Sequence, residues 1–158
     1  MIIALMLLSF AAMSQKSHMG AAYKATYSSN WVMAGSSYSN KVLACWKDFE
    51  NNTLDKHAAW YADTLTVMFA DSKAKKGKAE NLADVKKFRS SIKDYKVSVR
   101  AWISMKSVDK GDNLVCIWGE ESYTGGDGKK VAHGLHEVWV FNKDGKISTI
   151  VQFARVAE

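Results

Sequence analysis

The sequence has 158 residues, a formal net charge of +6 and 47% hydrophobic residues. This length and apolar content suit one domain with one sizeable core, and they argue against a disordered chain and against two substantial domains. The sequence contains no proline and two cysteines, which excludes proline-rich linkers and a disulfide-dense scaffold.

The chain begins with an apolar run over residues 1–13, and its first charged residue is Lys16. The run is too short to span a bilayer as a helix, but it fits the apolar region of a secretory signal peptide. Small residues near its end place cleavage between Ser14 and Gln15. No Lys or Arg precedes the run, and a buried N-terminal helix is the alternative. We predict a signal peptide over 1–14, no stable membrane span, and an exported protein, either periplasmic or secreted.

Export would place Cys45 and Cys116 in an oxidising compartment, where they could pair. Both cysteines have apolar neighbours in the sequence. Such residues are more often buried thiols, so we expect two free thiols and not a disulfide.

The N-terminal half predicts three helices. Residues 15–38 show little periodicity and are interpreted as an irregular lead-in. Apolar side chains then recur at three- to four-residue spacing, which is typical of a helix with one buried face. This spacing predicts a helix that begins at Ser39 or Asn40, a second over about 54–62 and a third over about 80–93. A short strand over 65–69 and an exposed lysine-rich turn over 71–78 separate the last two.

After Asp94 the hydrophobic period changes to two, which indicates half-buried strands. Turns rich in Gly, Asn and Asp divide this half into strands near 97–105, 114–124, 131–141 and 146–155. Helices followed by an antiparallel meander predict an α+β domain in which the sheet curls over the helices. We expect a single domain over 39–158.

Two passages carry a resemblance to a known family. Residues 54–69 (LDKHAAWYADTLTVMF) resemble the helix-to-strand passage of the nuclear transport factor 2-like superfamily, and 136–147 (HEVWVFNKDGKI) resemble its last hairpin. Gly77-Lys78 matches the glycine that opens the family's third helix. The superfamily includes SnoaL-like polyketide cyclases and ketosteroid isomerases, and the resemblance covers about 39–156.

The resemblance implies a cystatin-like cone, or α+β barrel, in which three N-terminal helices pack in a strongly curved, mainly antiparallel sheet. It also implies a pocket at the wide end of the cone and a homodimer formed through the outer face of the sheet. Alternation places Trp102 beside Arg100 and Ser104, away from the apolar stripe. A Trp exposed on a sheet face is unusual unless something covers it, so we predict that Trp102 lies at the dimer contact, with a ligand platform as the alternative.

The resemblance also allows the chemistry to be tested by position. The catalytic aspartate of ketosteroid isomerase-like members falls at Phe69, and their helix tyrosine falls at Cys45, so that chemistry is not supported. Glu137 falls where such members place an acid that donates a hydrogen bond in the pocket. By alternation Glu137 shares a face with Trp139, and apolar surroundings raise the pKa of a carboxyl group. Glu137 is the candidate catalytic acid or base, and a carboxylate satisfied by neighbouring groups is the alternative.

A set of aromatic residues with two polar ones forms the candidate ligand site, since apolar walls with a few polar groups are usual for small-molecule pockets. Core packing is the alternative. The candidate ligand-binding residues are Glu137, Trp139, Trp118, Trp46, Tyr61, Phe69, Phe88 and Gln152. The adjacent Glu120 and Glu121 point to opposite faces of their strand, and the sequence leaves open which one faces inward. The histidines lack metal-ligand spacing, so we predict no metal and no cofactor.

The positive charge is concentrated in residues 73–110, which hold 12 Lys and Arg against 4 Asp and Glu. The lysines lack interleaved exposed aromatic residues for base stacking. We therefore expect a solvated face and no nucleic-acid partner, with attraction to anionic lipid or polysaccharide as the alternative.

These observations predict an exported SnoaL-like domain that binds a small apolar or amphipathic molecule in an aromatic-lined pocket without catalysing a reaction. One alternative is an isomerase, cyclase or hydratase that uses Glu137 as general acid or base. The other alternative is a structural or partner-binding domain whose cone is filled by side chains.

Overall fold

The computed structural model describes residues 22–69 and 72–156. The predicted signal peptide over 1–14 lies outside these residues. The strands are β1 (Trp31–Met33), β2 (Tyr61–Phe69), β3 (Lys75–Lys76), β4 (Lys93–Ser107), β5 (Asn113–Thr124), β6 (Lys130–Phe141) and β7 (Ile147–Val156), and the helices are α1 (Ser36–Asn51) and α2 (Lys78–Ser91).

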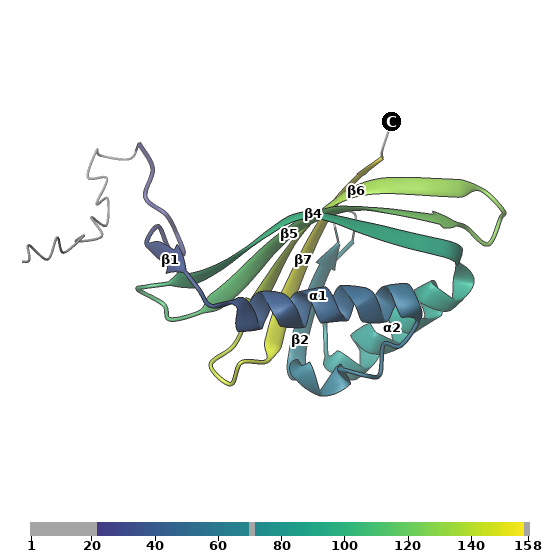
Figure 1. The fold of residues 1–158 in the computed structure, drawn as a ribbon. Helices are drawn as coiled ribbons and strands as arrows, with labels where there is room; N and C mark the ends of the chain where they lie inside the picture. The colour runs from purple at the N-terminus through teal and green to yellow at the C-terminus, as the bar shows by residue number, and fades with distance from the viewer. Residues whose placement is uncertain (1–21, 70–71, 157–158) are drawn as a thin grey trace, which may run out of the picture.

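All strands belong to one sheet with the order β1-β4-β5-β6-β7-β2-β3. Every neighbouring pair is antiparallel except β2 and β7, which are parallel. The long strands curve around α1, which crosses one face of the sheet with α2 beside it (Figure 1). The predicted α+β class and the curled, mainly antiparallel sheet are therefore confirmed.

The predicted helix count is wrong, because the described chain has two α-helices and not three. The segment expected to be the second helix contains only a 3-10 turn at Ala58–Trp60, and Tyr61 already opens β2. Helix α1 ends where Asn52 adopts a left-handed conformation, with φ 56° and ψ 42°. Too few residues then remain before β2 to offset the cost of nucleating another α-helix.

The lead-in is partly regular. Strand β1 pairs with the end of β4 through Trp31 and Ser107, and α1 begins at Ser36, three residues before the predicted start at Ser39. The sequence missed β1 because a three-residue strand is too short to show a period. The pairing of β1 with β4 covers one end of that edge strand.

A bulge in β4 reverses the predicted orientation of Trp102. The register shifts between Val99 and Ala101, so Trp102 pairs with the fully buried Ile117. Directly paired residues share a face of the sheet, and Trp102 therefore lies on the inner, helix-bearing face although 52% of it is exposed. Its predicted place on the outer face is wrong, since strict alternation does not survive an extra residue in one strand.

The core occupies one half of the cone. Its fully buried members include Val115 and Ile117 at the start of β5, Phe141 at the end of β6 and Ile147 at the start of β7. Val42 of α1 packs against them. The other half of the same strands carries less complete packing, and the candidate site lies there.

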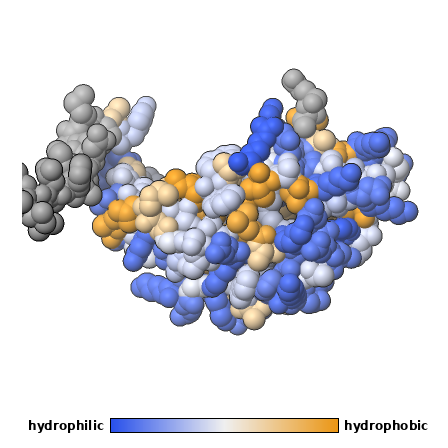
Figure 2. Space-filling view, viewed as in Figure 1, coloured by the Kyte–Doolittle hydropathy of each residue, from blue (hydrophilic) through white to orange (hydrophobic). Residues whose placement is uncertain are grey.

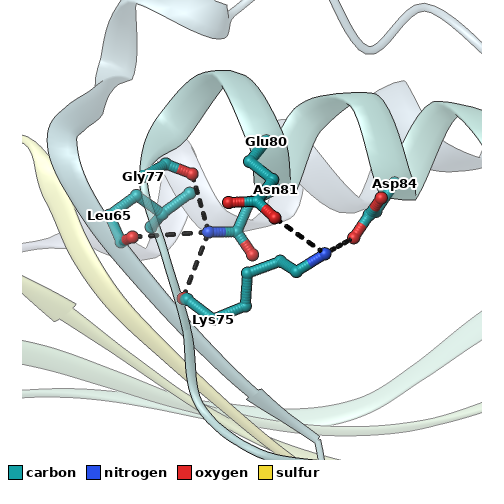
Figure 3. Close-up of polar contacts among 6 residues, drawn as sticks. All are labelled: Leu65, Lys75, Gly77, Glu80, Asn81 and Asp84. Atoms are coloured by element: carbon teal, nitrogen blue, oxygen red, sulfur yellow. Dashed lines mark hydrogen bonds and ion pairs between the residues drawn. The ribbon is translucent and has the colours of Figure 1, made fainter.

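Asn81 anchors the first turn of α2 to the sheet. Its Nδ2 lies 2.8 Å from the Gly77 carbonyl, 3.2 Å from that of Lys75 and 3.4 Å from that of Leu65 (Figure 3). The side chain is buried, so its amide satisfies backbone carbonyls that water does not reach. Helix α2 is thereby held against β2 and β3.

The basic segment is partly neutralised by ion pairs. The Nζ atoms of Lys78 and Lys86 each lie 2.5 Å from a carboxylate oxygen, of Asp63 and Asp55 respectively, and Lys75 pairs with Asp84 (Figure 3). On the side shown in Figure 2, hydrophobic side chains gather at the level of α1, and hydrophilic ones cover most of the α2 region. No helix in the described ranges is long and apolar enough to cross a membrane.

Candidate functional site

A cavity of about 480 Å³ lies between the two helices and the inner face of the sheet. Most of its wall is aromatic or aliphatic. Seven of the eight predicted ligand-binding residues line it, namely Trp46, Tyr61, Phe69, Phe88, Glu137, Trp139 and Gln152. They meet there because inward-facing positions of β2, β6 and β7 lie opposite α1 and α2.

The deep part of the cavity is organised around Glu137. Its Oε2 accepts hydrogen bonds from Nε1 of Trp46 and Nε1 of Trp139, both at 2.7 Å, and its Oε1 accepts one from Nε2 of Gln152, also at 2.7 Å. Burial raises the pKa of Glu137, and the three hydrogen bonds partly offset this effect. Both oxygens of Glu137 thus already accept hydrogen bonds from groups within the protein.

Trp46 reaches Glu137 because Gly119 leaves room for its ring. A Cβ on Gly119 would lie 2.7 Å from Cζ3 of Trp46 and would clash with the carbonyl oxygen of Ser98. Only glycine permits this approach, so the indole ring can lie close to β5 while its Nε1 donates to the carboxylate. The position of Trp46 is therefore set by two residues on neighbouring strands.

A second polar cluster lies farther along the same cavity and joins β4, β5 and β6. The Tyr95 hydroxyl donates to Oε2 of Glu121 at 3.0 Å, and Nδ1 of His133 lies 3.1 Å from Oε1 of Glu121. All three residues line the cavity. Burial and the nearby Glu121 carboxylate raise the pKa of Tyr95, so the phenol keeps its proton and acts as a donor.

Sequence reasoning did not identify this cluster. Glu121 pairs with His133 in the β5–β6 register, and this register settles that Glu121 faces inward. Glu120 faces outward and pairs with Arg100. Alternation on β6 does place His133 on the same face as Glu137. The sequence does not determine the register of the β5–β6 hairpin, however, and that register is what pairs Glu121 with His133.

Trp118 is not part of the cavity, and its predicted ligand role is a wrong assignment of face. It pairs with His136, and both lie on the outer side of the sheet with Phe153. The rings of Trp118 and His136 stack with centroids 4.8 Å apart and an interplanar angle of 8°, and those of His136 and Phe153 are 5.9 Å apart. Trp118 is 37% exposed and Phe153 53%.

The mouth of the cavity carries two half-exposed phenylalanines. Phe69 ends β2 and Phe88 lies on α2, and each is 43% exposed. Phe88 stacks on Phe49 at 6.3 Å and meets Tyr123 edge-on at 5.7 Å. These contacts join α1, α2 and β5 around an apolar entrance.

The cysteines and possible metal ligands can also be placed. Cys45 and Cys116 are free thiols, and Cys45 lines the cavity, where burial raises its pKa to about 11. Among the residues that the structure describes, no three His, Cys, Asp or Glu side chains form a group suited to a metal ion.

The geometry can bind an apolar body between aromatic walls and offer it a polar group at the His133 end. No family model matches the sequence, and no curated protein sequence matches it significantly. Solved structures do share the fold. An NTF2-like protein of unknown function from Burkholderia pseudomallei is 17% identical over 75% of this chain and 90% of its own, with a TM-score of 0.62.

Two further structures have TM-scores of 0.59 and are 14% identical to this chain. One is a putative SnoaL-like polyketide cyclase from Jannaschia, which covers 74% of this chain and 84% of its own. The other is an LEH-like epoxide hydrolase from M. tuberculosis, which covers 75% of this chain and 82% of its own. The curved sheet, the two helices within it and these likenesses together show that the chain has the nuclear transport factor 2-like fold.

Proposed function

We propose that the protein binds one small, largely apolar molecule in the cavity between α1, α2 and the inner face of the sheet. The observation that carries this proposal is the cavity itself, whose volume of about 480 Å³ falls in the range of small-molecule sites. A filled cone would leave no such space beside Trp139. The similar solved structures support small-molecule binding in general terms, since this fold includes structures described as a cyclase and as an epoxide hydrolase.

In this proposal Glu137 positions the aromatic walls and does not act as a catalytic acid or base. A general acid or base needs an atom free to exchange a proton with the substrate. Both oxygens of Glu137 accept hydrogen bonds from Trp46, Trp139 and Gln152. The carboxylate therefore fixes the orientation of two indoles that a bound molecule would contact.

Calorimetric titration with naphthalene tests the proposal, because this probe has no polar group. The Ile150→Trp substitution fills the cavity, which Ile150 lines. The matched control is Thr149→Trp, which places the same side chain one residue away on the opposite face of β7. We expect saturable binding to the wild type and to Thr149→Trp, and at least tenfold weaker binding to Ile150→Trp. Equal affinity in all three proteins would overturn the proposal.

We also propose that a second copy of the chain covers the outer face of the sheet. The support is the aromatic row of Trp118, His136 and Phe153, which leaves large apolar side chains exposed on neighbouring strands. Exposed apolar surface of this kind typically marks an interaction site. The predicted contact residue, Trp102, lies on the other face and takes no part in this interface.

Sedimentation velocity distinguishes the two faces. Phe153→Ser is expected to shift the protein from dimer toward monomer, whereas Trp102→Ser leaves the dimer intact. A wild-type protein that sediments as a monomer at high concentration would contradict the dimer, and a shift caused only by Trp102→Ser would place the contact on the inner face.

A further inference from the structure

The two polar clusters of the cavity differ in what they leave available to a ligand. Glu137 receives three hydrogen bonds from within the protein. In the second cluster, Glu121 receives Tyr95 on one oxygen and His133 on the other. Both carboxylates therefore have hydrogen-bond donors within the protein. His133, however, has a second ring nitrogen, Nε2, and because His133 lines the cavity this nitrogen can contact a ligand.

The hydrogen bond to Glu121 fixes the tautomer of His133. A carboxylate only accepts, so Nδ1 must carry the hydrogen that it shares with Glu121. In the neutral ring, Nε2 then holds a lone pair and is an acceptor. Within the described part of the chain, Nε2 makes no hydrogen bond to another residue, and it is not among the buried atoms without a partner. It is accessible and able to accept.

Neighbouring tyrosines hold the His133 ring and the Glu121 carboxylate in this orientation. Tyr95 donates to the other oxygen of Glu121, and Tyr123 packs edge-on against the His133 ring with centroids 6.2 Å apart. The raised pKa of Tyr95 keeps its hydroxyl protonated and donating. The residues come from three adjacent strands, so the orientation of the imidazole rests on the rigid sheet and not on a loop.

We propose that Nε2 of His133 accepts a hydrogen bond from a hydroxyl group of the bound molecule. The ligand class is therefore an apolar, ring-sized molecule that carries a hydroxyl at the end nearer His133. Along β6, His133 and Glu137 are four residues apart on the same face, about 13 Å along the strand. Leu135 lies between them and lines the cavity, so the apolar body has a wall to rest on while its hydroxyl reaches the histidine.

This inference rests on the proposed binding function, and a pair of probes separates the two. Naphthol and naphthalene share a ring system and differ by one hydroxyl. Calorimetry gives both affinities, and the indole N–H resonances of Trp46 and Trp139 report occupancy of the cavity by NMR. We expect wild type to bind naphthol about tenfold more tightly than naphthalene.

Three variants locate the source of that preference. His133→Phe keeps a ring but removes the acceptor, and it should bind both probes with equal affinity. Glu121→Gln removes the charge that fixes the Nδ1–H tautomer, and it should reduce the preference; ring-nitrogen NMR shifts of His133 report the tautomer directly. The matched control, His136→Phe, makes the same change on the same strand but on the outer face, and it should keep the full preference.

The possible outcomes separate the hydroxyl subsite from the proposed binding function. Naphthalene binding with no preference for naphthol, or a preference that survives His133→Phe, overturns the hydroxyl subsite and leaves the proposed binding function standing. Failure of both probes to perturb the Trp46 and Trp139 resonances overturns both. A wild-type His133 that carries its hydrogen on Nε2 in the naphthol complex also contradicts the proposal, because that nitrogen could then only donate.

Discussion

Glu137 and Glu121 face the same cavity from neighbouring strands, yet their hydrogen-bond partners give them different roles. Glu137 is buried and holds two indoles and an amide. Glu121 is held by Tyr95 and in turn orients His133, whose second nitrogen stays accessible. Glu137 accepts from three protein donors and holds the two indoles in place, whereas Glu121 orients a histidine whose second ring nitrogen is left for a ligand.

The largest effect is expected from removing the acceptor at the deep anchor. Glu137→Leu leaves the Nε1–H groups of Trp46 and Trp139 without their partner, and we expect it to lower the free energy of unfolding by roughly 3 kcal/mol. Glu137→Gln keeps an oxygen that accepts from both indoles. Its new NH2 group can donate to Oε1 of Gln152 once the Gln152 amide has flipped. That variant should stay within about 1 kcal/mol of wild type. Urea unfolding measures both, and similar losses in the two variants would show that the anchor depends on charge and not on hydrogen bonding.

A smaller loss should follow from crowding the ring that Glu137 holds. In Gly119→Ala the new Cβ meets the Ser98 carbonyl oxygen and the Trp46 ring, and we expect a loss of about 2 kcal/mol. Gly134→Ala is the matched control in the next strand, where a Cβ meets only the Arg155 side chain, at 3.2 Å. Thermal unfolding of the two variants measures the difference. Equal stability would mean that Trp46 is not held against β5.

The second cluster should matter less for stability than for binding. Glu121→Gln retains hydrogen-bonding capacity toward Tyr95 and His133, so we expect a loss of about 1 kcal/mol or less in urea unfolding. If this change costs as much as Glu137→Leu, the two carboxylates do not have the different roles assigned to them.

The smallest effect is the pH dependence of stability that comes from Glu137. Its pKa is raised above the ordinary value of 4.5, so just above that pH the folded chain holds a proton that the unfolded chain releases. Stability from this group therefore falls as pH rises from 4.5 to the folded pKa and is level above it. The stability of Glu137→Gln relative to wild type should increase across that window. Urea unfolding at a series of pH values tests this, and a relative stability that decreases with pH would show that the hydrogen bonds outweigh burial.

The period-two pattern was sufficient to predict β4 to β7 and the inward positions of β6, because each of those strands is long and half-buried. It failed where one residue changes the pattern. The bulge before Ala101 moved Trp102 to the inner face, and the short segment before Tyr61 formed a strand entry instead of a helix.

The candidate site was predictable to the same extent. Glu137, Trp139 and Gln152 followed from alternation and the resemblance to the family, and Trp46 followed from helical spacing. Trp118 was assigned to the wrong face because its strand's register was open, and that same register hid the pairing of Glu121 with His133. Cross-strand contacts depend on turn geometry, which local sequence patterns do not determine.

The most direct test of the binding site is a crystal structure of the protein soaked with naphthol. We predict one molecule in the cavity, with its rings packed against Leu135 and its hydroxyl within hydrogen-bonding distance of Nε2 of His133. Density only on the outer aromatic row beside Trp118, with the cavity closed by the protein's own side chains, would contradict it.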